Sequence, residues 1–407
     1  MCMSIQLLDT TLREGLQDAH LPWFSVDKQV EIAKKLDETG LDFIEVGQPT
    51  AHPELYRGAK EIIKLGLKSN IVVHGMARKM DVDAAHELGA QWIGIYAPID
   101  KDSLLYQYSQ PLSKEAAMAM ILESVRYAKQ KGLNVRFSIE KGANLPITEW
   151  IEAARQLENV GVDRLSYVDT LGILDPKTLY ENLKEIKKAG IGVPLHVHLH
   201  NDKGFALENA MTAYENGIKC IDTTIDGLGE RRGIPALDLI IENLIKRRVK
   251  NAWKIEHLNE LKTLVESCYT RETREGEIAH VAGPHLRREI LHLESGSPRK
   301  EPTPYYPHTK ESTEKLVFLV SRIAGKDTAR YLLKILGVEE DEETTLKIYS
   351  EIRDGQYSGV SIDEFSPDII EIKKQITDLY PNAFLTEFIR EQDKEVKREI
   401  TGEGKIL

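Results

Sequence analysis

Three histidines recur at every second position in the segment LHVHLHND, at residues 196, 198 and 200. Side chains two positions apart on a β-strand lie on the same face, so these three imidazoles are predicted to point in one direction. Imidazole is a frequent ligand of divalent metal ions. A single histidine in a strand is more often a hydrogen-bonded core residue. The metal-site interpretation is favoured here because these histidines lie near the end of a predicted strand.

A second group of polar residues follows the first apolar run of the chain, in the segment DTTLREGLQ from Asp9 to Gln17. Glu14 supplies a carboxylate that could join His198 and His200 in a facial set of three metal ligands, leaving positions open for a bidentate 2-oxo acid. Beside it, Arg13 could stabilise the oxygen of an enolate. The alternative for Arg13 is an ion pair with Asp9.

The segment NVRFSIEKG places Arg136, Ser138 and Glu140 on one face of a predicted strand. An inward-facing arginine needs an anion, which could be a second carboxylate on the substrate or a buried partner such as Glu45. The segment YVDTLG adds Asp169 and Thr170, of which Asp169 could equally cap a helix. The Gly-rich segment DGLGERRG could cradle a phosphate, but such turns are common.

Each of these polar groups lies within or just after one of eight short runs that are rich in β-forming residues. The runs begin at Ile5, Phe43, Ile71, Trp92, Val135, Leu165, Leu195 and Ile221. Helical patterns lie between them, as in VDKQVEIAKKLDETG, which begins after Ser25 as an N-cap and ends before Gly40. Alternating strands and helices over about 250 residues predict a (β/α)₈ barrel, with a doubly wound sheet as the alternative. In such a barrel the functional residues lie at the carboxyl ends of the strands.

Beyond Asn251 we expect no further strands. A Pro-rich charged stretch is followed by patterns that we interpret as helical, TEKLVFLVSRIAG and ARYLLKILGV. We therefore predict a barrel domain over 1–275, a linker subdomain over 276–310 and a helical region over 311–407.

Composition limits the possible partners. The chain has 407 residues, a formal net charge of −11 and three cysteines without metal-type spacing. This charge opposes binding to nucleic acid. No stretch approaches the roughly 18 apolar residues of a membrane span, and no export signal is evident. We expect a cytoplasmic protein that binds neither nucleic acid nor membrane.

Together, these motifs resemble those of the acyl-CoA condensing enzymes of the isopropylmalate synthase and homocitrate synthase family. They are DTTLREGLQ, DTLG, HLHND and GLGERRG, in the family's order. The resemblance implies a role in amino-acid biosynthesis and an acyltransferase reaction, the Claisen condensation of acetyl-CoA with a 2-oxo acid, supported by Mg²⁺, Mn²⁺ or Zn²⁺. It implies metal ligands Glu14, His198 and His200, substrate contacts from Gln17, Arg136, Ser138 and Thr170, and catalytic roles for Arg13 and Glu140.

The segment EIAHVAGPHL is similar to the family's H-x-x-G-x-H element, which reaches the active site of a partner subunit. The resemblance implies that His285 transfers a proton and that the protein is a homodimer. Without it, His280 and His285 would be interpreted as surface histidines in a loop.

The segment RFSIE is closer to homocitrate synthases than to isopropylmalate synthases, which favours a dicarboxylic 2-oxo acid. Alternatives are an oxaloacetate-using synthase that forms citrate, an isopropylmalate or citramalate type of synthase, a lyase or aldolase of the same barrel group, and a non-catalytic relative. The family pattern is broken at Ile234, where asparagine is usual, and at Lys141, where an acidic residue is usual. These departures suggest a divergent member.

Overall fold

Eight parallel strands close into a barrel in the computed structural model, which describes residues 5–106, 108, 111–250, 253–273, 277–281, 315–336 and 341–361. The closure joins the first and last strands, with Gln6 opposite Cys220 and Asp9 opposite Thr223. The predicted (β/α)₈ barrel is therefore confirmed, and the doubly wound alternative is wrong. The strands are β1 (Gln6–Asp9), β2 (Phe43–Glu45), β3 (Asn70–Met76), β4 (Trp92–Pro98), β5 (Asn134–Glu140), β6 (Arg164–Asp169), β7 (Leu195–Leu199) and β8 (Cys220–Thr223).

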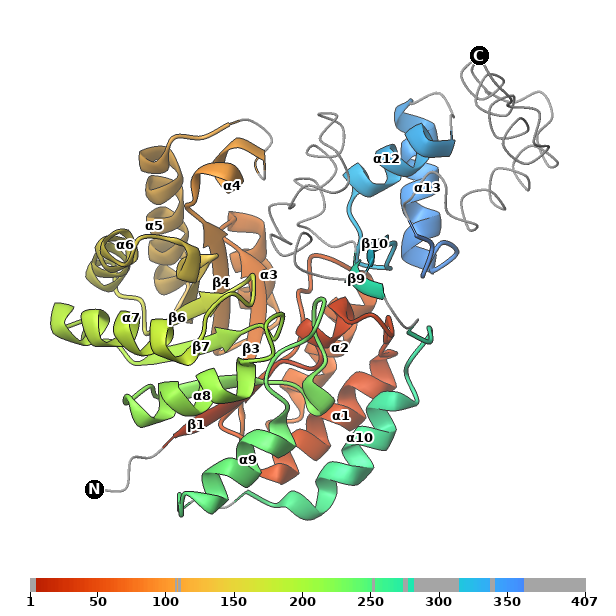
Figure 1. The fold of residues 1–407 in the computed structure, drawn as a ribbon. Coiled ribbons are helices and arrows are strands. Elements are labelled where there is room, and N and C mark those ends of the chain that lie inside the picture. Colours follow the sequence, from red (N-terminus) through yellow and green to blue (C-terminus); the bar gives the residue numbers. More distant parts are fainter. Residues whose placement is uncertain are drawn as a thin grey trace, which may run out of the picture.

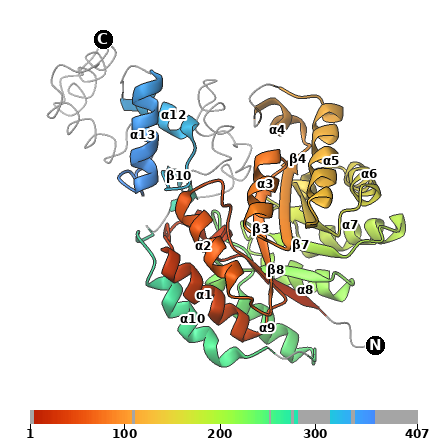
Figure 2. The ribbon, with the colours of Figure 1, turned by 180° about the vertical axis from the view of Figure 1, so that it is seen from behind.

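Helices surround the barrel on its outer side (Figure 1; Figure 2, from behind). They are α1 (Val26–Thr39), α2 (Pro53–Lys64), α3 (Lys79–Glu87), α4 (Lys101–Tyr106), α5 (Lys114–Gln130), α6 (Ile147–Asn159), α7 (Pro176–Ala189), α8 (Ala206–Glu215), α9 (Leu237–Lys246) and α10 (Leu258–Glu266). As predicted, α1 begins after Ser25, whose hydroxyl accepts a hydrogen bond from the Lys28 amide, and ends at Gly40, whose φ is +86°. Such caps satisfy backbone groups that the helix itself leaves unpaired.

The barrel lumen differs from the apolar layer between strands and helices. That layer contains large buried side chains such as Trp150, Phe137 and Tyr167. The residues that the strands bury in the lumen include charged or titratable ones, such as Glu45, Arg136, His196 and Asp222. Burying such groups without partners costs several kcal/mol each by a rough estimate, so their mutual pairing is a condition of the fold.

A smaller unit follows the barrel. It contains the parallel strands β9 (Glu277–Val281) and β10 (Lys315–Leu319) and the helices α12 (Lys326–Leu336) and α13 (Glu342–Asp354). The expectation of no strands beyond Asn251 is therefore wrong, and the run KLVFL within TEKLVFLVSRIAG is a strand. Helix α12 covers the pattern ARYLLKIL, as expected. The predicted domain bounds stay a prediction, since most of 276–310 lies outside the described residues.

This second unit contacts the barrel beside α2 (Figure 1). The Arg322 guanidinium lies over the Trp23 ring, 4.0 Å from its centroid, and 3.5 Å from the Glu54 carboxylate. The His52 ring lies 3.1 Å from the backbone oxygen of Arg353, at the end of α13. These contacts bring the segment after β10 to the carboxyl ends of the barrel strands.

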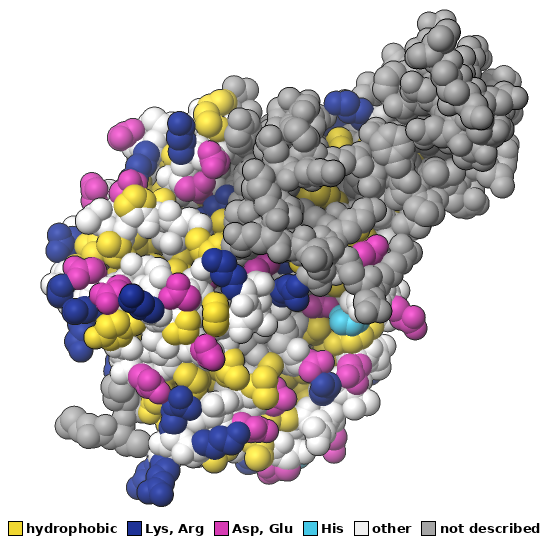
Figure 3. Space-filling model, in the orientation of Figure 1, with side chains coloured by type: hydrophobic (Ala, Val, Ile, Leu, Met, Phe, Trp, Pro, Cys, Tyr) yellow, Lys and Arg dark blue, Asp and Glu magenta, His cyan; other side chains and the backbone are white. Residues whose placement is uncertain are grey.

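Lysine and arginine side chains are interspersed with aspartate and glutamate over the barrel face shown in Figure 3. The expectation that the protein avoids nucleic acid stays a prediction. Among the described residues, no helix combines the length and apolar character that crossing a membrane requires.

Candidate active site at the carboxyl end of the barrel

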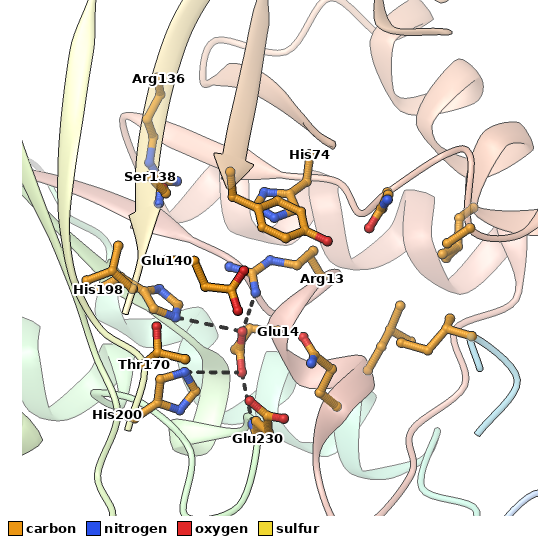
Figure 4. A pocket seen from close by; sticks show the side chains of 18 residues that line it. Arg13, Glu14, His74, Arg136, Ser138, Glu140, Thr170, His198, His200 and Glu230 are labelled. Atoms are coloured by element: carbon orange, nitrogen blue, oxygen red, sulfur yellow. Dashed lines mark hydrogen bonds and ion pairs between the residues drawn. The ribbon is translucent and has the colours of Figure 1, made fainter. Parts of the chain in front are cut away.

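One pocket at the carboxyl ends of the strands collects nine of the ten predicted site residues (Figure 4). Its lining is Arg13, Glu14, Leu16, Gln17, Gln48, Ala51, Leu55, His74, Tyr96, Arg136, Ser138, Glu140, Val168, Thr170, His198, His200, Glu230 and Ile323. The tenth predicted residue, His285, lies outside the described residues. As the barrel architecture predicts, side chains from all eight strands or the loops that follow them meet at this one place.

Glu14 faces both histidines that were predicted to share a metal ion with it, and dashed lines join it to each of them in Figure 4. Its Oε2 is 3.8 Å from His198 Nε2, and its Oε1 is 3.8 Å from His200 Nε2. These separations are too long for hydrogen bonds. They suit atoms that each bind one ion at about 2.1 Å. All three side chains are buried, so the residues present fit a divalent cation.

The protonation of this set also suits a cation. Burial alone would raise the pKa of Glu14, but Arg13, His200 and His198 together lower it to about 2. Burial lowers the pKa of His200 to about 4, so that ring is neutral near pH 7. A carboxylate and a neutral imidazole are the forms that bind metal.

The loop after β8 packs closely against Glu14. The Glu230 amide donates a hydrogen bond of 2.9 Å to Glu14 Oε1. A Cβ atom on Gly229 would lie only 3.0 Å from Glu14 Cγ, so glycine allows the close approach. The predicted Gly-rich turn therefore positions a carboxylate in this structure.

Arg13 pairs with two carboxylates, neither of which is Asp9. Its Nε donates to Glu45 Oε2 at 2.8 Å, and its Nη1 contacts Glu14 Oε2. The alternative of an Arg13–Asp9 ion pair is therefore wrong. Asp9 instead accepts a hydrogen bond from the Thr11 amide, and burial raises its pKa to about 7. For Arg13, no partner of Nη2 is found in the described part of the chain, so this nitrogen can serve a substrate.

Arg136 is almost fully buried and has two acidic partners in the lumen. Its Nη2 contacts Asp222 Oδ2, and its Nη1 lies 3.4 Å from Glu45 Oε1. Glu45 was the alternative partner considered from the sequence, and it is present together with an unpredicted one, Asp222. Arg136 also lines the pocket.

The other predicted substrate contacts line the same pocket. Thr170 Oγ1 accepts a hydrogen bond of 2.9 Å from the Lys141 amide, which leaves the hydroxyl proton for a ligand oxygen. Ser138 and Gln17 are buried at the pocket wall. Glu140, at the end of β5, points into the space between His198 and Arg13 (Figure 4). Lys141, the departure from the family pattern, takes a left-handed conformation with φ +55°.

His74 and Glu230 line the pocket but were not predicted as site residues, and Glu45 has more partners than the one considered from the sequence. His74 Nδ1 lies 3.0 Å from Glu45 Oε1, and the His74 ring stacks on Tyr96. Glu45 also accepts a hydrogen bond of 2.6 Å from Thr10. The position of His74 near the end of the third predicted strand was the available signal for its role in the lumen.

His280 is not a surface loop residue, as the alternative interpretation had it. It is buried in β9, with its Nε2 3.2 Å from the Glu230 carboxylate. Ile234 is buried too and does not line the pocket, and an isoleucine offers no ligand atom. Among the described residues that line the pocket, the group that could hold a metal ion is therefore Glu14, His198 and His200.

Comparisons with known proteins agree with this architecture. The HMGL-like family model matches residues 4–265. A homocitrate synthase of Pyrococcus horikoshii is 33% identical over 348 residues, covering 83% of this chain and 91% of that protein. The cytosolic homocitrate synthase isozyme of Saccharomyces cerevisiae is 32% identical over 265 residues, 64% of this chain and 61% of that protein.

Solved structures of two lyases share the fold. The HMG-CoA lyase of Bacillus subtilis superimposes with a TM-score of 0.57 at 21% identity, covering 66% of this chain and 95% of its own. The hydroxymethylglutaryl-CoA lyase of Pseudomonas aeruginosa gives 0.59 at 18% identity, covering 72% and 100%. At these identities the likeness concerns the barrel fold alone.

Proposed function

The chain belongs to the HMGL-like family, in the group of the homocitrate and isopropylmalate synthases, and from its site we propose that it condenses acetyl-CoA with a dicarboxylic 2-oxo acid. One observation carries the proposal: a single pocket joins the set Glu14, His198 and His200 to the buried guanidinium of Arg136. The first set suits the 2-oxo acid end of a substrate, and Arg136 suits a second carboxylate.

In this reaction the methyl group of acetyl-CoA loses a proton, its carbon attacks the keto carbon, and water then cleaves the thioester to release CoA. Glu14, His198 and His200 would hold a divalent ion, and when bound this ion would supply polarisation of the keto group. Arg13 directs its free Nη2 at the oxygen on which charge develops. Thr170 and Ser138 orient the substrate by hydrogen bonds. We assign proton transfer to Glu140, which points into the pocket, and to His285.

Two imidazole ligands favour Zn²⁺ or Mn²⁺ over Mg²⁺, because Mg²⁺ prefers a shell of oxygen ligands. We propose one of the former two as the physiological ion. Equilibrium titration of the metal-free protein with each ion measures this preference directly.

We also propose a cytoplasmic homodimer in which His285 acts in the partner subunit's site, as the family element implies. Mixing two inactive variants, Arg13→Ala and His285→Ala, tests this arrangement. In a shared site, one of the two pockets of a mixed dimer has both residues, so activity returns on mixing. Two inactive variants that stay inactive after subunit exchange would refute the shared site.

The deciding experiment measures CoA thiol release from acetyl-CoA with 2-oxoglutarate, oxaloacetate, pyruvate and 2-oxoisovalerate, with Zn²⁺, Mn²⁺ or Mg²⁺. We expect release that requires 2-oxoglutarate and stops with chelator. Release with oxaloacetate would instead indicate citrate formation, and release with an apolar oxo acid would refute the role of Arg136. No release with any oxo acid would overturn the synthase proposal in favour of thioester cleavage, which the related barrel lyases make the second hypothesis.

A further inference from the structure

A single carboxylate, that of Asp222 on β8, contacts both a proposed metal ligand and the proposed substrate arginine. It is fully buried in the lumen. Its Oδ2 contacts Arg136 Nη2 and lies 3.2 Å from His198 Nδ1. Its Oδ1 lies 3.5 Å from His196 Nδ1. One oxygen thus serves both a proposed metal ligand and the proposed substrate arginine.

Asp222 forms an ion pair with the Arg136 guanidinium through Oδ2, so this oxygen faces donors and accepts hydrogen bonds. His198 must therefore carry its proton on Nδ1 to donate to Asp222. In a neutral ring this leaves the lone pair on Nε2, the atom that lies 3.8 Å from Glu14 Oε2. The hydrogen bond to Asp222 thus selects the ligand tautomer.

The second histidine of the set has no such support. His200 Nδ1 is buried without a hydrogen-bond partner among the described residues. The two proposed ligands therefore differ: one is held by a carboxylate and the other is not. Replacing Asp222 would therefore change the orientation of His198 and Arg136 and leave His200 unaffected.

We propose that Asp222 is a positioning residue that fixes the tautomer and orientation of His198 and anchors Arg136 through the same oxygen, so that metal affinity and oxo-acid affinity depend on one group. This inference rests on the proposed function for the identity of the two ligands. It assigns Asp222 no contact with the substrate or the ion.

A different role for this cluster, a second metal site formed by His196, Cys220 and Asp222, is disfavoured. Arg136 contacts Asp222, and Arg164 Nη1 lies 3.1 Å from His196 Nε2, so two positive charges already occupy the surroundings of the cluster. Burial raises the pKa of the Cys220 thiol well above its usual value. A protonated thiol is a poor metal ligand.

The test is Asp222→Asn in the full chain, with the affinity for Zn²⁺ and Mn²⁺ measured by titration of the metal-free protein. We expect a loss of about 10-fold to 100-fold, the usual effect of removing a carboxylate behind a ligand histidine. The matched control is Asp42→Asn, because the Asp42 carboxylate accepts from the Leu7 amide and not from a histidine. Unchanged metal affinity in a folded Asp222→Asn protein would overturn the assignment. Absence of metal binding in the unmodified protein would instead overturn the proposed function.

Calorimetry of 2-oxoglutarate binding to metal-saturated protein measures the second consequence. Asp222→Asn should weaken this binding about 10-fold, because Arg136 loses its anchor, whereas Asp42→Asn should leave it unchanged. Equal oxo-acid affinity in both variants would refute the coupling of the metal ligand and the substrate arginine.

A measurement on the unmodified protein tests the same proposal if the Asp222→Asn variant does not fold. Long-range ¹H–¹⁵N correlation spectra of ¹⁵N-histidine-labelled, metal-free protein report the tautomer of each ring, and His198→Gln identifies the signal. We expect the Nδ1–H tautomer for His198. An Nε2–H tautomer would overturn the proposal.

Discussion

At the scale of single residues, the proposed ligands contribute one donor atom each, so removing one should cost metal binding more than stability. His198→Ala is expected to lower metal affinity and metal-dependent turnover by roughly 100-fold or more, since the remaining two ligands cannot complete a facial set. Metal titration and turnover assays measure these losses, and circular dichroism verifies that the variant is folded. The exposed His86 on α3 provides the control, His86→Ala. Full activity of His198→Ala would exclude it from the ligand set.

Arg136 is tested by a substitution that keeps its charge, because Asp222 and Glu45 both depend on that charge. Arg136→Lys should raise the KM for a dicarboxylic oxo acid about 10-fold, since lysine cannot hold two acceptors in the planar geometry of a guanidinium. The KM for 2-oxoisovalerate, tested at high enzyme concentration, should change little. An equal rise for both acids would contradict a contact with the second carboxylate.

Asp9 gives a prediction about stability and pH. Burial raises its pKa from 3.8 to about 7 in the folded chain. Its protonated form favours the folded state, so its contribution is fully present below pH 3.8 and is lost as the pH rises through about 7. Asp9→Asn removes this dependence. Relative to the unmodified protein, the variant should gain roughly 2 to 3 kcal/mol between pH 5 and pH 8.

Urea unfolding at the two pH values measures this difference for Asp9→Asn and for the unmodified protein. Asp27→Asn, at an exposed position in the first turn of α1, is the control for a general effect of losing an aspartate. Parallel pH profiles for Asp9→Asn and the unmodified protein would contradict the raised pKa.

At the scale of elements, the loop after β8 is predicted to hold Glu14 in place. In Gly229→Ala, the new Cβ would meet Glu14 Cγ at 3.0 Å and the Gly233 Cα at 3.1 Å. We expect metal affinity to fall about 10-fold, because the Glu14 carboxylate must move away from the histidines.

Gly204 offers a matched control for this loop variant. It also has a positive φ, +79°, but an added Cβ meets nothing within 4 Å. Gly204→Ala therefore tests backbone strain without pressure on Glu14, and its metal affinity should be unchanged. Equal metal affinities in Gly229→Ala and Gly204→Ala would show that contact with Glu14 is unimportant. The measurement is the same metal titration.

Sequence patterns were sufficient for the barrel and for most of its strand-end residues, since alternation and helix caps are local properties. They failed at β10, because the run LVFLV fits a buried strand and a buried helix equally well. The roles of His74 and Asp222, and the further partners of Glu45, were missed for another reason. Each of the three is one residue within an ordinary strand, and only closure of the barrel shows that strands 2, 3 and 8 bring them to Arg136 and His198.

At the scale of the whole molecule, the second unit completes the pocket wall. Ile323, which follows β10, lines the pocket with Leu16, Ala51 and Leu55, so part of the wall comes from outside the barrel. The neighbouring residue, Arg322, contacts both the second unit and the barrel. The guanidinium lies over Trp23, approaches Glu54, and donates a hydrogen bond of 2.9 Å to the Arg353 backbone oxygen. One side chain therefore joins α13, α2 and the loop before α1.

Arg322→Ala should loosen this attachment without unfolding the barrel, because the barrel core is separate from the core around α12 and α13. Leu21 of the barrel still packs with Val317 and Leu319 of β10, so part of the attachment remains in the variant. A cation–π contact and partly exposed ion pairs contribute about 1 to 2 kcal/mol together, so the attached state should lose roughly 5-fold to 30-fold in population. Hydrogen exchange should accelerate in 315–336 and 341–361 and stay unchanged in the barrel strands. The KM for the oxo acid should rise, since Ile323 leaves the pocket wall more often.

Lys326→Ala is the control for Arg322→Ala, because Lys326 belongs to the same unit and pairs within it, with Glu342. Its exchange and kinetics should match those of the unmodified protein. If Arg322→Ala accelerates exchange while KM stays constant, Ile323 is dispensable to substrate binding and the barrel alone forms the functional pocket. If neither changes, the unit is held by other contacts. A joint rise in exchange and KM would show that the second unit is part of the active site.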